Sequence, residues 1–227
     1  MVMKLDKVVP FGRSFDEYVK MFKLSCQDLQ GKILAVADGP ASFNATASKQ
    51  ESQVISIDPV YNFSGEEIKQ RFEAVVDNII AQVAATPDDW VWSYHQSPED
   101  LRKNRQQALE IFLADYDLGK QQRRYQIGEL PSLNFSDQTF DLALCSHFLF
   151  LYSEQLSYQF HLQSIQEILR VSRELRIFPL LTLMLQRSPY LDRIITDLHS
   201  LGYGTAIIKS DYEFQKGGNE MLVISRE

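Results

Sequence analysis

Short apolar runs alternate along this chain with stretches in which apolar residues recur every three or four positions. Such runs are typical of strands buried on both faces of a parallel sheet, and the recurring spacing is typical of amphipathic helices. The alternation predicts an α/β fold. The apolar runs expected to form interior strands are 33–37, 54–57, 142–151 and 177–185.

The end of the chain has a different pattern. Residues 204–209 and 221–225 flank a polar turn around Lys216-Gly217-Gly218-Asn219, and this arrangement predicts an antiparallel hairpin. A dinucleotide-binding dehydrogenase sheet is all parallel, so an antiparallel terminal strand argues against that class. The length of 227 residues favours a single domain, residues 1–227.

A turn follows the first predicted strand, and an acid ends the second. Gly39 permits a sharp turn after Asp38, and Ser42 or Asn44 is expected to cap a short helix through residues 45–47. Asp58 ends the second strand, where a carboxylate can accept hydrogen bonds from both ribose hydroxyls. The pattern therefore predicts a nucleoside-bearing ligand.

Charge narrows the choice of nucleoside. A pyrophosphate approaches bare backbone amides, so a carboxylate at Asp38 disfavours a dinucleotide and suits a cationic ligand such as S-adenosylmethionine. Residues 34–41, Leu-Ala-Val-Ala-Asp-Gly-Pro-Ala, resemble the first motif of class I S-adenosylmethionine-dependent methyltransferases. Ala35 stands in the place of the family's acid, and Ala37 and Ala41 replace two glycines, whereas Gly39 is retained.

Residues 128–130 and the run 140–147 resemble the third and fourth motifs of the same family. The resemblance implies that Glu129 ends the third strand and accepts from the adenine amine, that the Leu130 amide bonds the adjacent ring nitrogen, and that Ser146 lies near the transferable methyl. It also implies contacts from Ala37, Asp38 and Gly39 to the cofactor. Residues 175–181 resemble the fifth strand, with Ser172-Arg173-Glu174 where the family has a Pro-Gly-Gly turn. The implied fold is a Rossmann-like three-layer sandwich with a seven-stranded, mostly parallel sheet and an antiparallel terminal strand.

A helical insert is expected between the second and third strands. Residues 61–122 occupy roughly sixty positions where a minimal crossover needs about a dozen to twenty. Apolar residues recur with helical spacing from Ile68 to Val83, Pro87 stops that helix, and Ser97-Pro98 begins a second one. We expect the insert to cover the carboxyl edge of the sheet and shape an acceptor pocket. Equally, its aromatic residues 90–95 can serve only to pack the two helices.

The N-terminal segment, residues 1–30, is predicted to be helical. Ser14 and Glu17 form a capping box ahead of an apolar helix face. Arg13 is a candidate partner for the methionine carboxylate, since a guanidinium pairs well with a carboxylate. The alternative is an ordinary surface arginine.

Methyl transfer from a sulfonium needs a general base only where the acceptor must lose a proton. His147 follows Ser146 and is the candidate base, with a packing role as the alternative. Tyr152 and His161 are weaker candidates. The chain has neither zinc-ligand spacing nor a hydrolase nucleophile elbow.

The overall composition limits the class of partner. A net charge of -7 disfavours non-specific binding to nucleic acid, which needs clustered lysine and arginine. The two cysteines, Cys26 and Cys145, suggest no disulfide framework, so a reduced cytoplasmic setting is expected, and the apolar runs are too short to span a membrane. The sequence thus predicts methyl transfer to a small molecule. The alternative is a noncatalytic module of the same fold that acts through protein partners.

Overall fold

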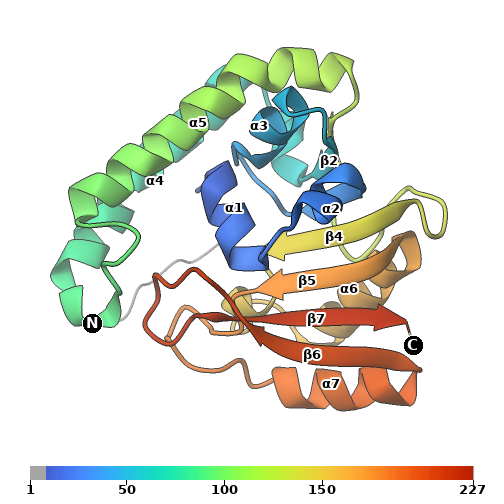
Figure 1. Cartoon of the computed structure of the whole chain (residues 1–227). Coiled ribbons are helices and arrows are strands. Elements are labelled where there is room, and N and C mark those ends of the chain that lie inside the picture. The colour runs from blue at the N-terminus through green and yellow to red at the C-terminus, as the bar shows by residue number, and fades with distance from the viewer. Residues whose placement is uncertain (1–8, 227) are drawn as a thin grey trace.

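A seven-stranded mixed sheet forms the centre of the protein. The computed structural model describes residues 9–226, so residues 1–8 of the predicted N-terminal segment lie outside it. The sheet order is β3-β2-β1-β4-β5-β7-β6 (Figure 1). Strands β1 to β5 pair in parallel, and β7 runs antiparallel to both of its neighbours. The strands are β1 Lys32–Val36, β2 Gln53–Ile57, β3 Tyr125–Gln126, β4 Phe140–Ser146, β5 Ser172–Phe178, β6 Tyr203–Lys209 and β7 Glu220–Arg226.

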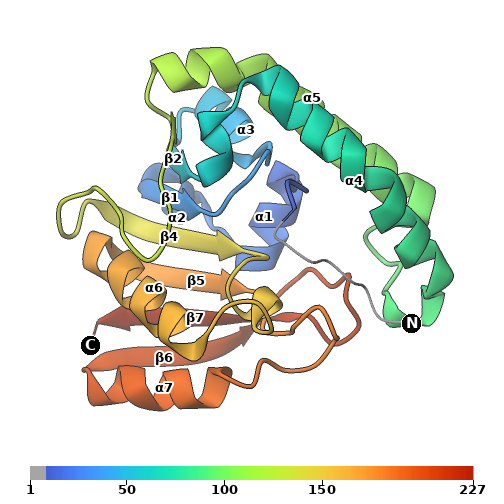
Figure 2. The same ribbon diagram turned by 180° about the vertical axis from the view of Figure 1, so that it is seen from behind.

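Helices cover both faces of this sheet because side chains alternate between the faces along each strand. In β1, Ile33 and Ala35 pack with helices α1 (Phe15–Phe22) and α3 (Phe43–Lys49). Leu34 and Val36 point the other way and pack with α6 (Tyr158–Val171) and α7 (Leu191–Ser200). Figures 1 and 2 show α1 and α6 on opposite faces, and the short α2 (Cys26–Gln30) lies beside α1. The three-layer sandwich predicted from the sequence is therefore confirmed.

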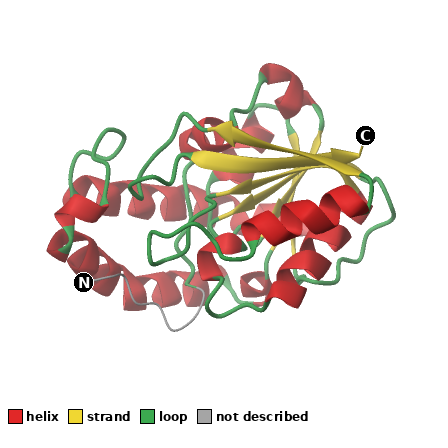
Figure 3. Ribbon diagram, turned by 90° about the horizontal axis from the view of Figure 1, so that it is seen from below, coloured by secondary structure: helices red, strands yellow, loops and turns green. Residues whose placement is uncertain are grey.

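The insert between β2 and β3 folds as two long helices that lie side by side. They are α4 (Gly65–Ala85) and α5 (Pro98–Gln121), and Ser64 and Ser97 cap them. Apolar residues of the two helices form a core of their own with Tyr61 and Tyr125. Figure 3 shows the pair extending beyond the ends of the strands. Short 3-10 turns, Pro59–Asn62 and Pro87–Asp89, precede and follow α4.

Four local predictions were wrong in detail. The strands expected at 142–151 and 177–185 are β4 and β5, but these end at Ser146 and Phe178, so the later residues of both runs lie outside the strands. Glu129 does not end the third strand, because β3 stops at Gln126. Strand β5 begins at Ser172, directly after α6, so Ser172-Arg173-Glu174 belongs to the strand and no turn precedes it. Helix α3 has no side-chain cap from Ser42, and Asn44 lies inside the helix, where its amide bonds to the sheet.

Candidate functional site

The carboxyl ends of β1 and β2 meet at a tight loop, residues 37–39. Ala37 and Gly39 both adopt the left-handed conformation, with φ of 54° and 55°. Ala37 therefore adopts a backbone conformation that favours glycine, at some cost in strain. Its amide donates to the Ile57 carbonyl at 2.8 Å, which ties the loop to the end of β2.

Asp58 holds this loop in place. One carboxylate oxygen, Oδ2, accepts the Gly39 amide at 2.9 Å, and the other, Oδ1, accepts the Val60 amide at 2.8 Å. The Tyr61 hydroxyl donates to the Gly39 carbonyl at 2.7 Å. Burial raises the pKa of Asp58, and the negative charge of Glu129 raises it further. The two amide hydrogen bonds act in the opposite direction and lower it. Each Asp58 oxygen still has a lone pair that a ligand hydroxyl can use.

Asp38, the middle residue of this loop, is buried and only 5% exposed. Its carboxyl accepts hydrogen bonds from the Tyr18 hydroxyl and, at 2.7 Å, from the Ser56 hydroxyl. Burial raises its pKa to about 7, although these two bonds act in the opposite direction. The sequence argument that Asp38 presents a free carboxylate in the loop is therefore wrong, because the protein's own hydroxyls take up that carboxyl group.

Glu129 and Leu130 follow β3 and lie in different environments. The Glu129 side chain is exposed and close enough to Asp58 to influence its pKa. Leu130 is buried in the core on the α6 side of the sheet. The structure thus brings Glu129, Asp58 and the Gly39 loop to the same edge of the sheet, which is the arrangement expected of a nucleoside site.

Ser146 and His147 continue this edge at the end of β4. The Ser146 hydroxyl and His147 Nδ1 are 2.9 Å apart, and the His147 amide donates to the Phe178 carbonyl at 2.7 Å. His147 also has a left-handed backbone, with φ of 52°. Burial, with the charges of Arg13 and Arg105, lowers the pKa of His147 well below its ordinary value. His147 is therefore a neutral imidazole.

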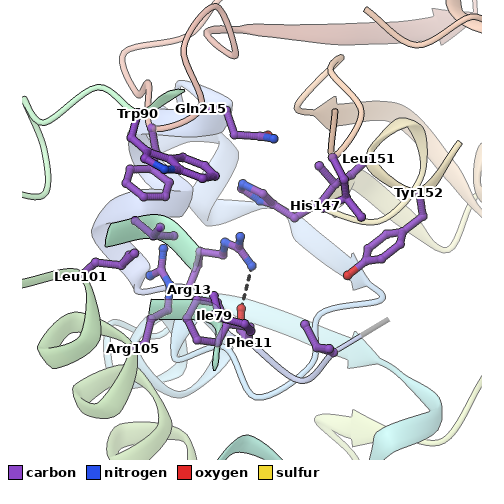
Figure 4. A pocket seen from close by; sticks show the side chains of 14 residues that line it. Phe11, Arg13, Ile79, Trp90, Leu101, Arg105, His147, Leu151, Tyr152 and Gln215 are labelled. Carbon is purple, nitrogen blue, oxygen red and sulfur yellow. Dashed lines mark hydrogen bonds between the residues drawn. The ribbon is translucent and has the colours of Figure 1, made fainter. Parts of the chain in front are cut away.

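A pocket with a cavity of about 70 Å³ lies beyond His147, between the carboxyl edge of the sheet and the insert. Arg13, His147 and Gln215 reach it from three segments far apart in the sequence (Figure 4). Sequence reasoning found Arg13, His147 and Tyr152 of this lining. It expected the insert to line a pocket without assigning the individual residues, which are Ile79, Val83, Trp90, Leu101 and Arg105. It missed the lining from outside the insert, which is Val9, Phe11, Leu151, Leu183, Phe214 and Gln215.

A buried ion pair supports the wall of this pocket. Arg105 of α5 donates to both Glu17 oxygens, at 2.6 and 2.7 Å, and both side chains are 1% exposed or less. The Tyr212 hydroxyl donates to Glu17 Oε1 at 2.8 Å, and His95 Nε2 lies 3.3 Å from the same oxygen. Burial would raise the pKa of Glu17, but Arg105 and His95 hold it well below its ordinary value. The capping-box spacing marks Glu17, but no sequence signal marks Arg105 as its partner.

The described residues were also searched for metal sites and for membrane-spanning helices. In residues 9–226 no group of three or more His, Cys, Asp or Glu is placed to hold a metal ion. Over the same range, no helix combines the length and the apolar character that crossing a membrane requires.

Comparison with known proteins places the chain in a family. Uncharacterized protein MJ0045 of Methanocaldococcus jannaschii is 37% identical over 225 residues, which cover 99% of each chain. The chain belongs to the family of this archaeal protein. No family model matches it.

Solved structures extend the likeness at the level of the fold. The PH0226 protein of Pyrococcus horikoshii is 12% identical, with a TM-score of 0.50, over 94% of this chain and 89% of that one. Magnesium protoporphyrin IX methyltransferase from Synechocystis, crystallised with S-adenosylhomocysteine, is 13% identical, with a TM-score of 0.49, over 94% of this chain and 82% of that one. At such identities the likeness concerns the fold alone. Together with the sheet order, the likeness to the Pyrococcus horikoshii protein gives the chain a Rossmann-like fold.

Proposed function

We propose that the protein is an S-adenosylmethionine-dependent methyltransferase that acts on a small molecule. The observation that carries the proposal is the Gly39–Asp58 pair at the carboxyl ends of β1 and β2. In open α/β sheets, ligands collect at this edge, next to the point where the strand order reverses.

The residues at this edge fit the cofactor. A Cβ atom placed on Gly39 would meet no atom within 4 Å, so the space beside the loop is open. In our proposal Asp58 binds the ribose, while Glu129 and the Leu130 amide bind the adenine. Residues Ala37 to Gly39 then hold the methionine half. The Asp38 side chain supports them through Tyr18 and Ser56 rather than by direct charge.

Ser146 and His147 would face the reacting end. The bound cofactor supplies an activated methyl group on its sulfonium, so the protein must chiefly orient the acceptor and exclude water. A neutral imidazole is the form that can take a proton from an acceptor hydroxyl or amine. We therefore assign His147, held by Ser146, as the candidate base for acceptors that lose a proton. The mainly apolar pocket beside His147 is suited to a small molecule.

Calorimetry with S-adenosylhomocysteine tests the cofactor site. The Asp58→Asn variant keeps a residue able to cap the following turn but lacks the charge. We expect it to weaken binding by about 1 to 3 kcal/mol, the cost of losing hydrogen bonds to a charged acceptor. Asp141→Asn is the matched control, because Asp141 is exposed near the opposite end of β4. Failure of the unaltered protein to bind at millimolar concentration would refute the proposal.

A noncatalytic module is the second candidate function. The favouring observation is that protein groups already engage the loop: Tyr18 bonds Asp38, Tyr61 bonds the Gly39 carbonyl, and Asp58 bonds two amides. If the protein binds S-adenosylmethionine but a broad acceptor screen gives no methylated product and a protein partner is found, this reading replaces the first.

A further inference from the structure

We propose that the pocket beside His147 binds a methyl acceptor with a carboxylate or similar anionic group on an apolar body, and that Arg13 pairs with that anion. The role of this ligand as a methyl acceptor rests on the proposed function. The anion site itself rests on the charges and the walls of the pocket.

Among residues 9–226, the pocket carries one positive charge, that of Arg13, with no carboxylate of its own. Arg105 shares both of its terminal nitrogens with the two oxygens of Glu17, so these charges cancel. Arg13 donates only to the Phe11 carbonyl, at 2.6 Å, and its Nε has no hydrogen-bond partner among the described residues. Glu17 is the carboxylate whose charge acts on Arg13, and Arg105 already occupies it. His95 and His147 are neutral, because burial lowers the pKa of each.

An unpaired guanidinium in such a place is costly. Arg13 is partly buried and its Nε is fully buried, so the guanidinium loses part of its hydration without gaining a carboxylate of its own among the described residues. An anion brought by a ligand offsets that cost. Burial, with the repulsion of Arg105, lowers the pKa of Arg13 to about 10, so Arg13 stays charged at neutral pH. A planar guanidinium matches the two oxygens of a carboxylate. The geometry thus favours an anionic ligand over a neutral one.

The remaining walls describe the rest of the ligand. Phe11, Ile79, Trp90 and Leu183 contribute apolar surface, as does Phe214. These side chains suit an aliphatic or aromatic body.

The side chain of Gln215 adds a polar group to the wall of the pocket. Gln215 is buried, and its Oε1 has no hydrogen-bond partner among the described residues. A buried acceptor atom without a donor favours a ligand with an N–H or O–H group. Figure 4 shows Gln215 and Arg13 reaching the pocket on either side of His147, so a ligand that spans them would pass the candidate base.

The position of the pocket assigns the anion to the acceptor rather than to the cofactor. Neither the loop residues 37–41 nor Asp58, Glu129 and Ser146 line it. Its walls come mainly from the insert, from residues 9–13, from the segment after β4 and from the β6–β7 connection. Arg13 therefore faces a space that is separate from the proposed nucleoside site.

The test compares hexanoate and benzoate with their uncharged amides, on the full chain saturated with S-adenosylhomocysteine. Binding is measured by calorimetry and by the tryptophan fluorescence of the protein, which should respond because Trp90 lines the pocket. We expect each carboxylate to bind at least about tenfold more tightly than its amide, as a charge-assisted pair predicts. Arg13→Met should abolish this preference, and Arg13→Lys should retain part of it. Arg102→Met, at an exposed arginine of α5, should leave it unchanged.

Several outcomes would overturn the proposal. It fails if neither carboxylate binds at millimolar concentration, or if acid and amide bind equally to the unaltered protein, a comparison that needs no variant to fold. It also fails if Arg13→Met weakens S-adenosylhomocysteine binding as strongly as carboxylate binding, because Arg13 then serves the methionine carboxylate. If the carboxylates bind as expected but the protein binds no S-adenosylhomocysteine, the anion site stands and the methyl-transfer proposal fails.

Discussion

Asp38 illustrates how burial changes the role of a single residue. The sequence marks it as a charge in a ligand-binding loop, yet its side chain is buried with its oxygens bonded to Tyr18 and Ser56. Removal from water disfavours the ionised form, so its pKa rises to about 7 from an ordinary value of 3.8. Asp38 is consequently a structural group that titrates close to neutral pH.

The raised pKa of Asp38 predicts a pH-dependent stability. Between pH 3.8 and about 7 the folded protein retains a proton that the unfolded chain has lost, so the Asp38 contribution to the free energy of unfolding falls as pH rises through this window. Asn at this position cannot titrate. The free energy of unfolding of Asp38→Asn, relative to the unaltered protein, should therefore increase across the window by up to about 1.4 kcal/mol for each pH unit and level off above it. Urea unfolding at several pH values measures this difference, and a difference that does not change with pH would contradict it.

At the scale of elements, the Glu17–Arg105 pair joins α1 to α5, two helices far apart in the sequence. The same Glu17 also forms the capping box of α1 with Ser14 and accepts from Tyr212 in the β6–β7 connection. One carboxylate therefore fixes three segments around the pocket. The insert is held by this buried contact as well as by its own apolar core.

Breaking this pair should be costly. Arg105→Met leaves Glu17 buried without its counter-ion, and we expect a loss of about 3 to 5 kcal/mol in the free energy of unfolding. Arg102→Met removes an exposed ion pair with Asp77 on the same helix and should cost less than about 1 kcal/mol. Denaturant unfolding of both variants makes the comparison. Equal losses in the two would show that Arg105 contributes no more than a surface charge does.

At the scale of the whole molecule, the sheet order brings the two proposed sites next to each other. The ends of β1 and β2 form the nucleoside edge, while the end of β4, the insert and the β6–β7 connection form the acceptor pocket. His147 lies between them, directly after Ser146. In our proposal, an acceptor in this pocket would therefore lie near the transferable methyl.

Ligand binding at the nucleoside edge should stabilise the whole fold. S-adenosylhomocysteine at a hundred times its Kd adds about 2.7 kcal/mol to the free energy of unfolding. For a chain of this length we expect a rise in Tm of about 5 to 11 °C, at about 2 to 4 °C for each kcal/mol. A thermal scan with NAD in parallel provides the control, because the antiparallel β7 distinguishes this sheet from the all-parallel sheet of dinucleotide-binding dehydrogenases, so we expect no shift with NAD. A shift with NAD alone would overturn the choice of nucleoside.

The sequence by itself determined the elements. The apolar runs at 33–37 and 54–57, the terminal hairpin and the two insert helices follow from local periodicity, from Ser14 and Ser97 as caps and from Pro87 as a stop. These features depend on residues within a few positions of one another, so one chain is enough to predict them. The order of motif-like segments was likewise enough to predict the fold class.

Only the tertiary structure decided which side chains meet. The Glu17–Arg105 pair, the burial of Asp38 and the unpartnered Gln215 all depend on contacts between segments that are distant in the sequence. The charge state of each group depends on its burial and its neighbours, and spacing along the chain carries no information about either. For this reason the sequence proposed Arg13 and His147 as candidates, whereas only the folded protein shows that they line one pocket, in which Arg13 has no carboxylate of its own among residues 9–226.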